Sequence, residues 1–117
     1  MCGRYQLDAE LPQGAELLES ILEFEVTPRY NAGPMQTMPI VRLEHEKRVA
    51  KMLRWGLVPT WAADQSFAPR LINARSETVA EKPAFKEAFR LGRCLVPATG
   101  FYEWKTLGKY KQPHRSI

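Results

Sequence analysis

The spacing of hydrophobic residues along the chain predicts two helices. Within residues 15–26, leucines and an isoleucine recur on one face while three glutamates occupy the other, which is typical of an amphipathic helix. A second helix is expected from about Pro83 to Leu91. Proline is tolerated in the first turn of a helix, and Gly92 stands where such a helix would stop.

Alternating apolar and polar positions predict a β-hairpin near the middle of the chain. Val41 and Leu43 alternate with polar neighbours, a charged tip follows at 44–47, and residues 49–55 resume the pattern. The segment 27–39 holds three prolines, so we expect it to be a loop with restricted backbone freedom.

The C-terminal part of the chain is expected to form further strands. Residues 94–96 and 101–104 resemble short strands joined by a turn, and Leu107 and Gly108 then turn the chain again. Strands outnumber helices without regular alternation, which favours an α+β fold over a doubly wound parallel sheet. Residues 109–117 begin like a strand and stop, so the sheet is expected to keep an open edge.

The composition limits the class of protein. The chain has 117 residues, 44% of them hydrophobic and 26% charged, which suits one domain over residues 1–117. Its net charge of +4 is compatible with a polyanionic partner, although proteins without one often carry such an excess. No apolar stretch approaches the ~18 residues of a membrane span, and no signal peptide opens the chain. We therefore expect a cytoplasmic domain with no membrane partner.

Few cysteine and histidine residues are available for disulfides or metal binding. Cys2 and Cys94 have no C-x-x-C spacing, and with His45 and His114 they form no metal-binding pattern. No Walker loop or dinucleotide-binding glycine motif is present. The sequence therefore predicts no cofactor, no metal, and thiols that stay reduced.

Cys2 is the first candidate for chemistry. Methionine is commonly removed before a small residue such as cysteine, which would leave an α-amine and a thiol on the same residue. The amine can form an imine with an aldehyde, and the thiolate can then close a five-membered thiazolidine ring, helped by its proximity. The alternative is that Cys2 is an ordinary small residue near a chain end.

Two further segments carry polar groups suited to a reactive site. Asn73 supplies a donor and an acceptor without charge, and Arg75 supplies a planar fork suited to phosphate. The alternative is a turn that Asn73 caps and in which Arg75 pairs with Glu77. Glu103 lies among three aromatics on an expected strand, where an inward carboxylate could serve as acid or base; the alternative is a solvated edge strand.

Aromatic and basic residues offer contacts for a nucleic acid. An exposed Trp61 could stack on an unpaired base, whereas Trp55 is more readily interpreted as part of the core. Arginines from several segments would form a phosphate-binding stripe if the fold gathers them: Arg4, Arg29, Arg70 and Arg75.

Five motifs follow one another along nearly the whole chain. They are Met1-Cys2-Gly3-Arg4-Tyr5; Arg29-Tyr30-Asn31-Ala32 with Pro34; Arg54-Trp55-Gly56-Leu57-Val58-Pro59; Asn73-Ala74-Arg75-Ser76-Glu77-Thr78; and Gly100-Phe101-Tyr102-Glu103-Trp104. In this combination the chain resembles the SRAP family, the SOS response-associated peptidases, which are also called abasic-site processing proteins. The resemblance implies a mixed, strongly twisted β-sheet or partial barrel with a few short helices.

The resemblance also implies a reaction and the residues for it. Members of the family bind single-stranded DNA and form a covalent crosslink with abasic sites in the DNA damage response, after autoproteolytic removal of the first methionine. Carried over, Cys2 would be the nucleophile, Asn73 would orient the opened sugar, and Glu103 would act as acid and base. The DNA-binding residues would be Arg4 and Arg75 at phosphates, and Pro34 and Trp61 at bases.

The chain departs from the family at its end. The family's domain extends further and contributes a catalytic histidine from its C-terminal half, whose place His114 does not take. We therefore expect a SRAP domain that lacks its C-terminal part, with marginal stability, self-association through the open sheet edge, or limited activity. Two other functions remain as alternatives: a single-stranded DNA-binding module without catalysis, and an N-terminal-nucleophile amidohydrolase in which the amine of Cys2 is the base.

Overall fold

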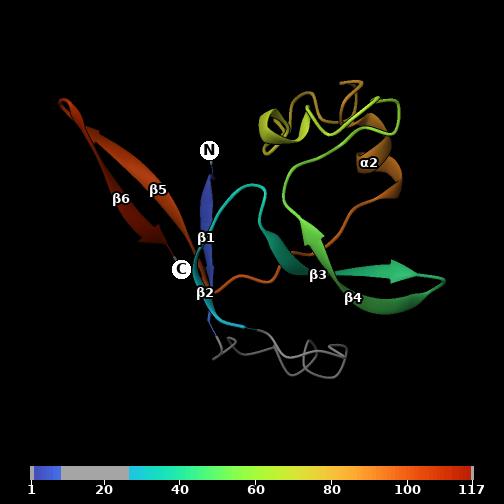
Figure 1. Cartoon of the computed structure of the whole chain (residues 1–117), viewed down its shortest axis with the longest axis horizontal. Helices are drawn as coiled ribbons and strands as arrows, with labels where there is room; N and C mark the ends of the chain where they lie inside the picture. Colours follow the sequence, from blue (N-terminus) through green and yellow to red (C-terminus); the bar gives the residue numbers. More distant parts are fainter. Residues whose placement is uncertain (1, 9–26, 117) are drawn as a thin grey trace.

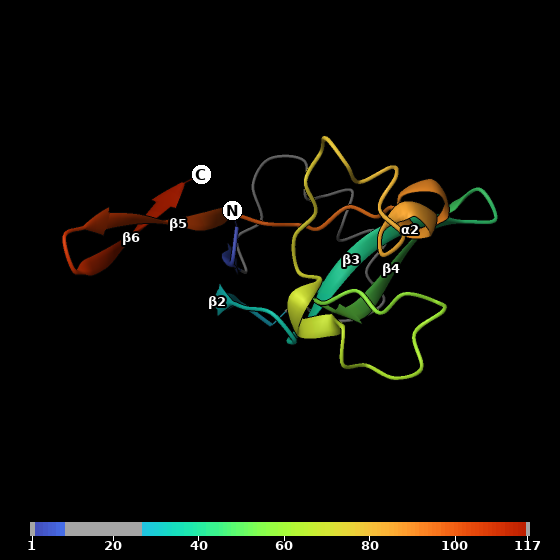
Figure 2. The same ribbon diagram turned by 90° about the horizontal axis from the view of Figure 1, so that it is seen from above.

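The computed structural model describes residues 2–8 and 27–116. The helix expected over residues 15–26 lies outside the described residues. Within them the chain forms a four-stranded sheet, a separate two-stranded hairpin and short helical segments (Figure 1). Seen from above, the outer hairpin of the sheet extends to one side, while the two-stranded hairpin and the helix lie together on the other (Figure 2).

The four-stranded sheet is built around the first strand of the chain. Its order is β2-β1-β5-β6, and the strands are β1 (Arg4–Leu7), β2 (Arg29–Ala32), β5 (Gly100–Leu107) and β6 (Tyr110–Ser116). Every pairing between these strands is antiparallel. In β1, Tyr5 lies opposite Ala32 on one side and opposite Phe101 on the other. Cys2 and Gly3, which precede β1, therefore lie where the chain enters the sheet between β2 and β5.

The hairpin predicted near the middle of the chain is confirmed. It consists of β3 (Thr37–Glu44) and β4 (Lys47–Arg54), joined by His45 and Glu46, which both have a positive φ. The prediction of a loop over residues 27–39 is wrong at both ends, because β2 and the start of β3 fall within it. Proline has no backbone N–H to donate, yet Pro39 is compatible with β3. Among the described residues β3 pairs with one strand, β4, so few N–H groups are needed on its other side.

The strands predicted near the C-terminal end are confirmed in part. β5 and β6 form a hairpin that turns after Leu107, as expected, with Gly108 at a φ of 60°. The strand predicted at residues 94–96 is reduced to a single bridge between Leu95 and Val41 of β3, with N–O distances of 2.9 and 2.8 Å. In the described part of the chain, β6 is an outer strand of its sheet, which agrees with the open edge predicted there.

Two short helical segments follow the β3–β4 hairpin. The first is η1 (Ala68–Arg70), and the second is α2 (Lys86–Leu91), which confirms the C-terminal part of the helix predicted from Pro83. As predicted, Gly92 ends α2, and its N–H donates to the carbonyl of Ala88 at 2.8 Å. None of the helices in the described segments has the length and apolar character needed to cross a membrane.

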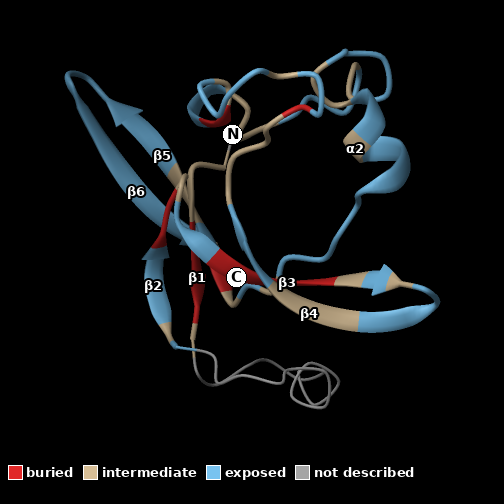
Figure 3. Ribbon diagram, turned by 45° about the vertical axis from the view of Figure 1, so that its right-hand side comes forward, coloured by how far each residue is buried: buried red, intermediate tan, exposed pale blue. Residues whose placement is uncertain are grey.

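The core is small and joins the four-stranded sheet to the start of the hairpin. Its main cluster consists of Tyr5, Leu7, Ala32 and Met38, with Trp55 packed against it. Figure 3 shows buried positions along β1 and β3, whereas the outer part of the β5–β6 hairpin and much of α2 are exposed. Because the core surrounds β1, it supports the backbone immediately after Cys2.

Candidate active site

Cys2 and Asn73 meet at the entrance to β1. Cys2 is half-buried, and its thiol donates to the carbonyl of Arg4 at 3.5 Å. The Nδ2 of Asn73 donates to the main-chain carbonyl of Cys2 at 2.8 Å, although the two residues are 71 positions apart. Asn73 therefore does not use this donor to cap a local turn, which was the alternative interpretation of its segment.

Trp55 holds the segment that carries Asn73. Its indole Nε1 donates to the carbonyl of Ile72 at 2.9 Å, immediately before Asn73. The neighbouring backbone is fixed as well, since the N–H of Leu57 donates to the carbonyl of Leu71 at 3.1 Å. The sequence placed Trp55 in the core but did not reveal this bond. The available signal was that a buried indole N–H usually has an acceptor.

Tyr5 connects Trp55 back to the strand that follows Cys2. The rings of Tyr5 and Trp55 lie 5.7 Å apart at an angle of 53°. Burial of Tyr5 raises the pKa of its hydroxyl to about 12, against the opposing effect of the nearby Arg29 charge. Cys2, Asn73, Trp55 and Tyr5 thus form a closed series of contacts between β1, the end of β4 and the loop after η1.

An apolar cavity of about 730 Å³ opens beside Cys2. Its walls include Tyr5, Trp55, Leu71, Cys94 and Phe101. A concave apolar site with few polar groups is typical of ligand-binding sites, because the walls bury the ligand while the polar groups orient it. Here the lining residues with polar side-chain groups include Cys2, Arg54 and Cys94.

Glu103 lies at the same end of the sheet as Cys2. In β5 it follows Tyr102, which is directly opposite Arg4 of β1, and it faces His114 of β6. The hydroxyl of Tyr102 donates to the carbonyl of Tyr30 at 2.7 Å, which fixes β5 relative to β2 across β1. The alternative interpretation of Glu103 on a solvated edge strand is wrong, because β5 lies between β1 and β6 and Glu103 is half-buried.

Two of the four predicted DNA-binding residues, Arg4 and Pro34, lie near this end of the sheet. The guanidinium of Arg4 donates to the side chain of Asn31 at 3.3 Å and lies over Gly33, which precedes Pro34. Arg75 is exposed and follows Asn73 by two residues. Its predicted alternative partner was Glu77, but no ion pair between them forms in the described structure.

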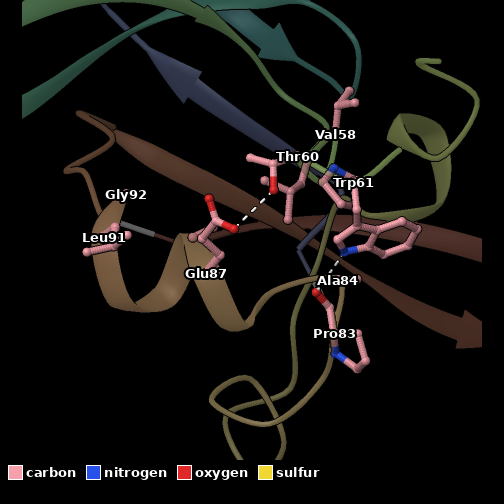
Figure 4. A pocket seen from close by; sticks show the side chains of 11 residues that line it. Val58, Thr60, Trp61, Pro83, Ala84, Glu87, Leu91 and Gly92 are labelled. Atoms are coloured by element: carbon pink, nitrogen blue, oxygen red, sulfur yellow. Dashed lines mark hydrogen bonds between the residues drawn. The ribbon is translucent and has the colours of Figure 1, made fainter. Parts of the chain in front are cut away.

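Trp61 belongs to a different part of the molecule. It is 57% exposed and lines a pocket of about 220 Å³ beside α2 (Figure 4). Its Nε1 donates to the carbonyl of Pro83 at 3.3 Å, and its ring meets Phe67 edge-on at 5.3 Å. In the same pocket, the Thr60 hydroxyl donates to Glu87 at 3.0 Å. The contacts of Trp61 are therefore with Pro83 and Phe67, not with the Cys2–Asn73 pair.

The predicted stripe of four arginines is divided between these two regions. Arg29 donates to Gln36 and Arg4 donates to Asn31, each at 3.3 Å, and Arg75 follows Asn73 in the sequence. Arg70 instead lies over the ring of Phe67 at 5.5 Å, beside Trp61. Trp61, Phe67 and Arg70 therefore form a separate aromatic and basic surface.

Comparison with known proteins places these features in a family context. Residues 1–116 match the family model described as SOS response associated peptidase (SRAP). The chain is 42% identical over 120 residues to the abasic site processing protein YoqW of Bacillus subtilis, covering 98% of this chain and 53% of YoqW. It is 34% identical to the abasic site processing protein HMCES of Gallus gallus, covering 82% of this chain and 32% of HMCES.

Solved structures share the fold. A phage-related protein of Bordetella bronchiseptica is 31% identical with a TM-score of 0.71, and a Bacteroides thetaiotaomicron protein is 26% identical with a TM-score of 0.70. The matches cover 96% of this chain but only 53% and 52% of those chains. The chain likewise spans about half the length of the Bacillus relatives it matches. The twisted, non-closed sheet with few helices that the resemblance implied is thereby confirmed, although its described strand pairs are all antiparallel and not mixed.

Proposed function

Because the chain belongs to the SOS response associated peptidase (SRAP) family, we propose that it processes abasic sites in single-stranded DNA through a covalent bond to Cys2. The observation that best supports this proposal is the 2.8 Å hydrogen bond from Asn73 to the carbonyl of Cys2. It fixes the backbone of the reactive residue at the mouth of an apolar cavity, where a sugar can enter.

The reaction begins with a free α-amine on Cys2. Hydrolysis of the Met1–Cys2 peptide bond consumes one water and releases methionine, in a step that the chain performs on itself. The amine then attacks the aldehyde of the ring-opened deoxyribose, and loss of water gives an imine. The thiolate adds to the imine carbon while the nitrogen takes up a proton, so aldehyde and aminothiol become thiazolidine plus one water.

Asn73 and Glu103 have different tasks in this reaction. Asn73 uses one amide hydrogen to hold Cys2, which leaves its other amide hydrogen and its side-chain oxygen for the hydroxyl groups of the sugar. Glu103, at the same end of the sheet, accepts and returns the protons that move during ring opening and loss of water.

The DNA strand is held by groups on both sides of the reactive residue. Arg4 and Arg75 bind phosphates next to the lesion, because a guanidinium matches the geometry of a phosphate. Pro34 contacts a base near Arg4, and the exposed ring of Trp61 stacks on a base farther along the strand. An abasic sugar in a single strand is accessible to such a site without strand separation.

Intact mass spectrometry tests the proposal in one experiment. The protein should lose one methionine, and incubation with an abasic oligonucleotide should add the mass of the oligonucleotide minus one water. Cys2→Ala has no thiol, so once its methionine has been removed, its α-amine should attach only when borohydride reduces the imine. Cys94→Ala is the matched control and should crosslink normally.

Two outcomes would overturn the proposal. Heat-stable attachment by Cys2→Ala without borohydride would show that the thiol is not needed. Reversible, salt-sensitive binding without any covalent product would identify a DNA-binding module.

A further inference from the structure

A second cavity, of about 640 Å³, lies between the β3–β4 hairpin and α2. We call it the arginine groove, because its lining contains four arginines and no acidic residue: Arg42, Arg48, Arg90 and Arg93. Two of them come from the hairpin and two from the end of α2 and the residues that follow. None of them belongs to the residues assigned above to DNA binding.

Backbone pairing brings the two halves of the groove together. The N–H of Val41 donates to the carbonyl of Leu95 at 2.9 Å, and the N–H of Leu95 donates to the carbonyl of Val41 at 2.8 Å. This bridge holds the segment after α2 beside β3, so that Arg90 and Arg93 share one cavity with Arg42. Figure 1 shows α2 and the hairpin on the same side of the molecule.

Little negative charge balances these arginines. Glu44 accepts a bond from the Nε of Arg42 at 2.8 Å and pairs with Lys51 at 2.6 Å, and these two cations lower the pKa of its carboxyl. One carboxylate thus serves two cations. Within residues 2–8 and 27–116, neither Arg48 nor Arg90 forms an ion pair.

The arginine groove and the cavity beside Cys2 share one lining residue. Cys94 lines both cavities, and the charge of Arg42 acts on its thiol, where it opposes the rise in pKa caused by burial. The groove also exposes apolar side chains, since Leu43, Leu91 and Leu95 are 70%, 71% and 72% exposed. Positive charge beside apolar surface is complementary to single-stranded DNA, because the phosphates are charged and the bases have apolar faces.

We propose that the arginine groove binds the sugar–phosphate backbone of the single DNA strand beyond the abasic site. This inference rests on the proposed function, because it assigns the path of the same strand as it leaves the Cys2 cavity. Each guanidinium offers a planar, doubly donating face to a phosphate, and binding releases the cations condensed on the strand. The exposed leucines contact the sugars and bases between the phosphates.

The test uses binding of undamaged single strands, which does not depend on the chemistry of Cys2. The double variant Arg48→Ala with Arg90→Ala is compared with Lys105→Ala with Lys109→Ala, which removes the same charge from the β5–β6 hairpin. Affinity is measured over a range of salt for strands of about 4 and about 16 nucleotides, lengths that bracket common single-strand site sizes. All four substituted positions are exposed, so both variants are expected to fold.

The arginine variant should bind the long strand more weakly and with a smaller salt slope. Two lost phosphate contacts reduce the slope of log K against log salt by ~1.4, since each contact on a single strand contributes ~0.7. The short strand should be unaffected, and the lysine variant should keep the slope of the parent. Equal slopes in the two variants would overturn the inference. Equal loss on both strand lengths, or lost binding of free deoxyadenosine monophosphate, would identify a site for small anions instead and would also overturn it.

The experiment separates this inference from the proposed function. If the parent protein forms no crosslink with an abasic strand but the arginine variant still shows the length-dependent loss, the covalent proposal fails and the groove stands. If crosslinking occurs normally and the two variants behave alike, the groove fails and the covalent proposal stands.

Discussion

The surroundings of Cys2 and the β5–β6 hairpin are both built on β-strands, yet they are held together differently. Around Cys2, the bond to Asn73 spans 71 positions and the bond from Trp55 to Ile72 spans 17. In the hairpin, successive pairs from Leu107–Tyr110 to Phe101–Ser116 join close neighbours in the sequence, and most of these side chains are exposed.

This difference predicts how each region responds to change. Contacts between distant segments form only when the whole core is in place, so a defect near Cys2 affects both stability and reactivity. A hairpin of local pairs can open by itself while the rest stays folded. Glu103 lies at the boundary between the two regions. It belongs to β5 of the hairpin, at the end of that strand that pairs with β1.

Two glycines with positive φ provide a matched pair for this comparison. A Cβ at Gly56, whose φ is 139°, would lie 2.9 Å from the carbonyl oxygen of buried Ala68. Gly56→Ala should therefore lower the free energy of unfolding by ~3 kcal/mol through strain and overpacking. A Cβ at Gly108, whose φ is 60°, would meet nothing within 4 Å, so Gly108→Ala should cost only ~1 kcal/mol. Urea denaturation measures both, and equal losses would contradict the comparison.

Glu103→Gln should separate reactivity from stability. The substitution keeps the shape of the side chain but removes a group that accepts and returns protons, so the rate of crosslinking should fall on the order of 100-fold. Affinity for undamaged DNA should change less than about twofold, as expected for a group that acts on the reacting sugar. Glu46→Gln at the tip of the β3–β4 hairpin is the control. Equal loss of rate and affinity would mean that Glu103 is structural.

Alkaline pH should weaken the Cys2 region through Tyr5. The pKa of Tyr5 is about 12 in the folded protein, against a reference value of 10.0. The stabilising contribution is therefore complete below pH 10 and is lost as pH rises towards 12, because the unfolded chain gives up its proton first. The free energy of unfolding should fall by roughly 2–3 kcal/mol over this range beyond the fall in Tyr5→Phe. Parallel pH profiles for the two proteins would exclude this contribution.

Trp55→Phe should have a small effect that is confined to crosslinking. It keeps an aromatic ring against Tyr5 but removes the donor to Ile72, so the segment of Asn73 is held less firmly. Crosslinking should slow about tenfold, which corresponds to ~1.4 kcal/mol, while binding of undamaged DNA is unchanged. In an Asn73→Ala background the same substitution should add nothing. An additive loss in the double variant would show that Trp55 does not act through Asn73.

The sequence predicted local structure where local signals were strong. The alternation from Val41 onwards identified the β3–β4 hairpin, and the Leu107–Gly108 turn was also found. The prediction of a loop over residues 27–39 missed β2. The three prolines in this segment indicate a loop more strongly than a run of four residues indicates a strand. The strand predicted around Leu95 became a single bridge, since whether a short apolar run pairs depends on partners that lie far away in the sequence.

The candidate site was less accessible to sequence reasoning. Residue chemistry made Cys2, Asn73 and Glu103 candidates and the family resemblance assigned their roles, which stay predictions until the variants are measured. The bond between Asn73 and Cys2 has no local signature, because it depends on how η1 and β1 are brought together by the core. The same holds for the arginine groove, whose members are separated along the chain by the loops after β4.

The hydrogen bond from Asn73 ends on the main chain of residue 2 and not on its thiol. The second position is therefore held in place whatever side chain it carries. Serine, threonine or an unnatural aminothiol introduced there should inherit the same placement, so the scaffold offers a route to proteins that capture other aldehydes with a nucleophile of the designer's choice.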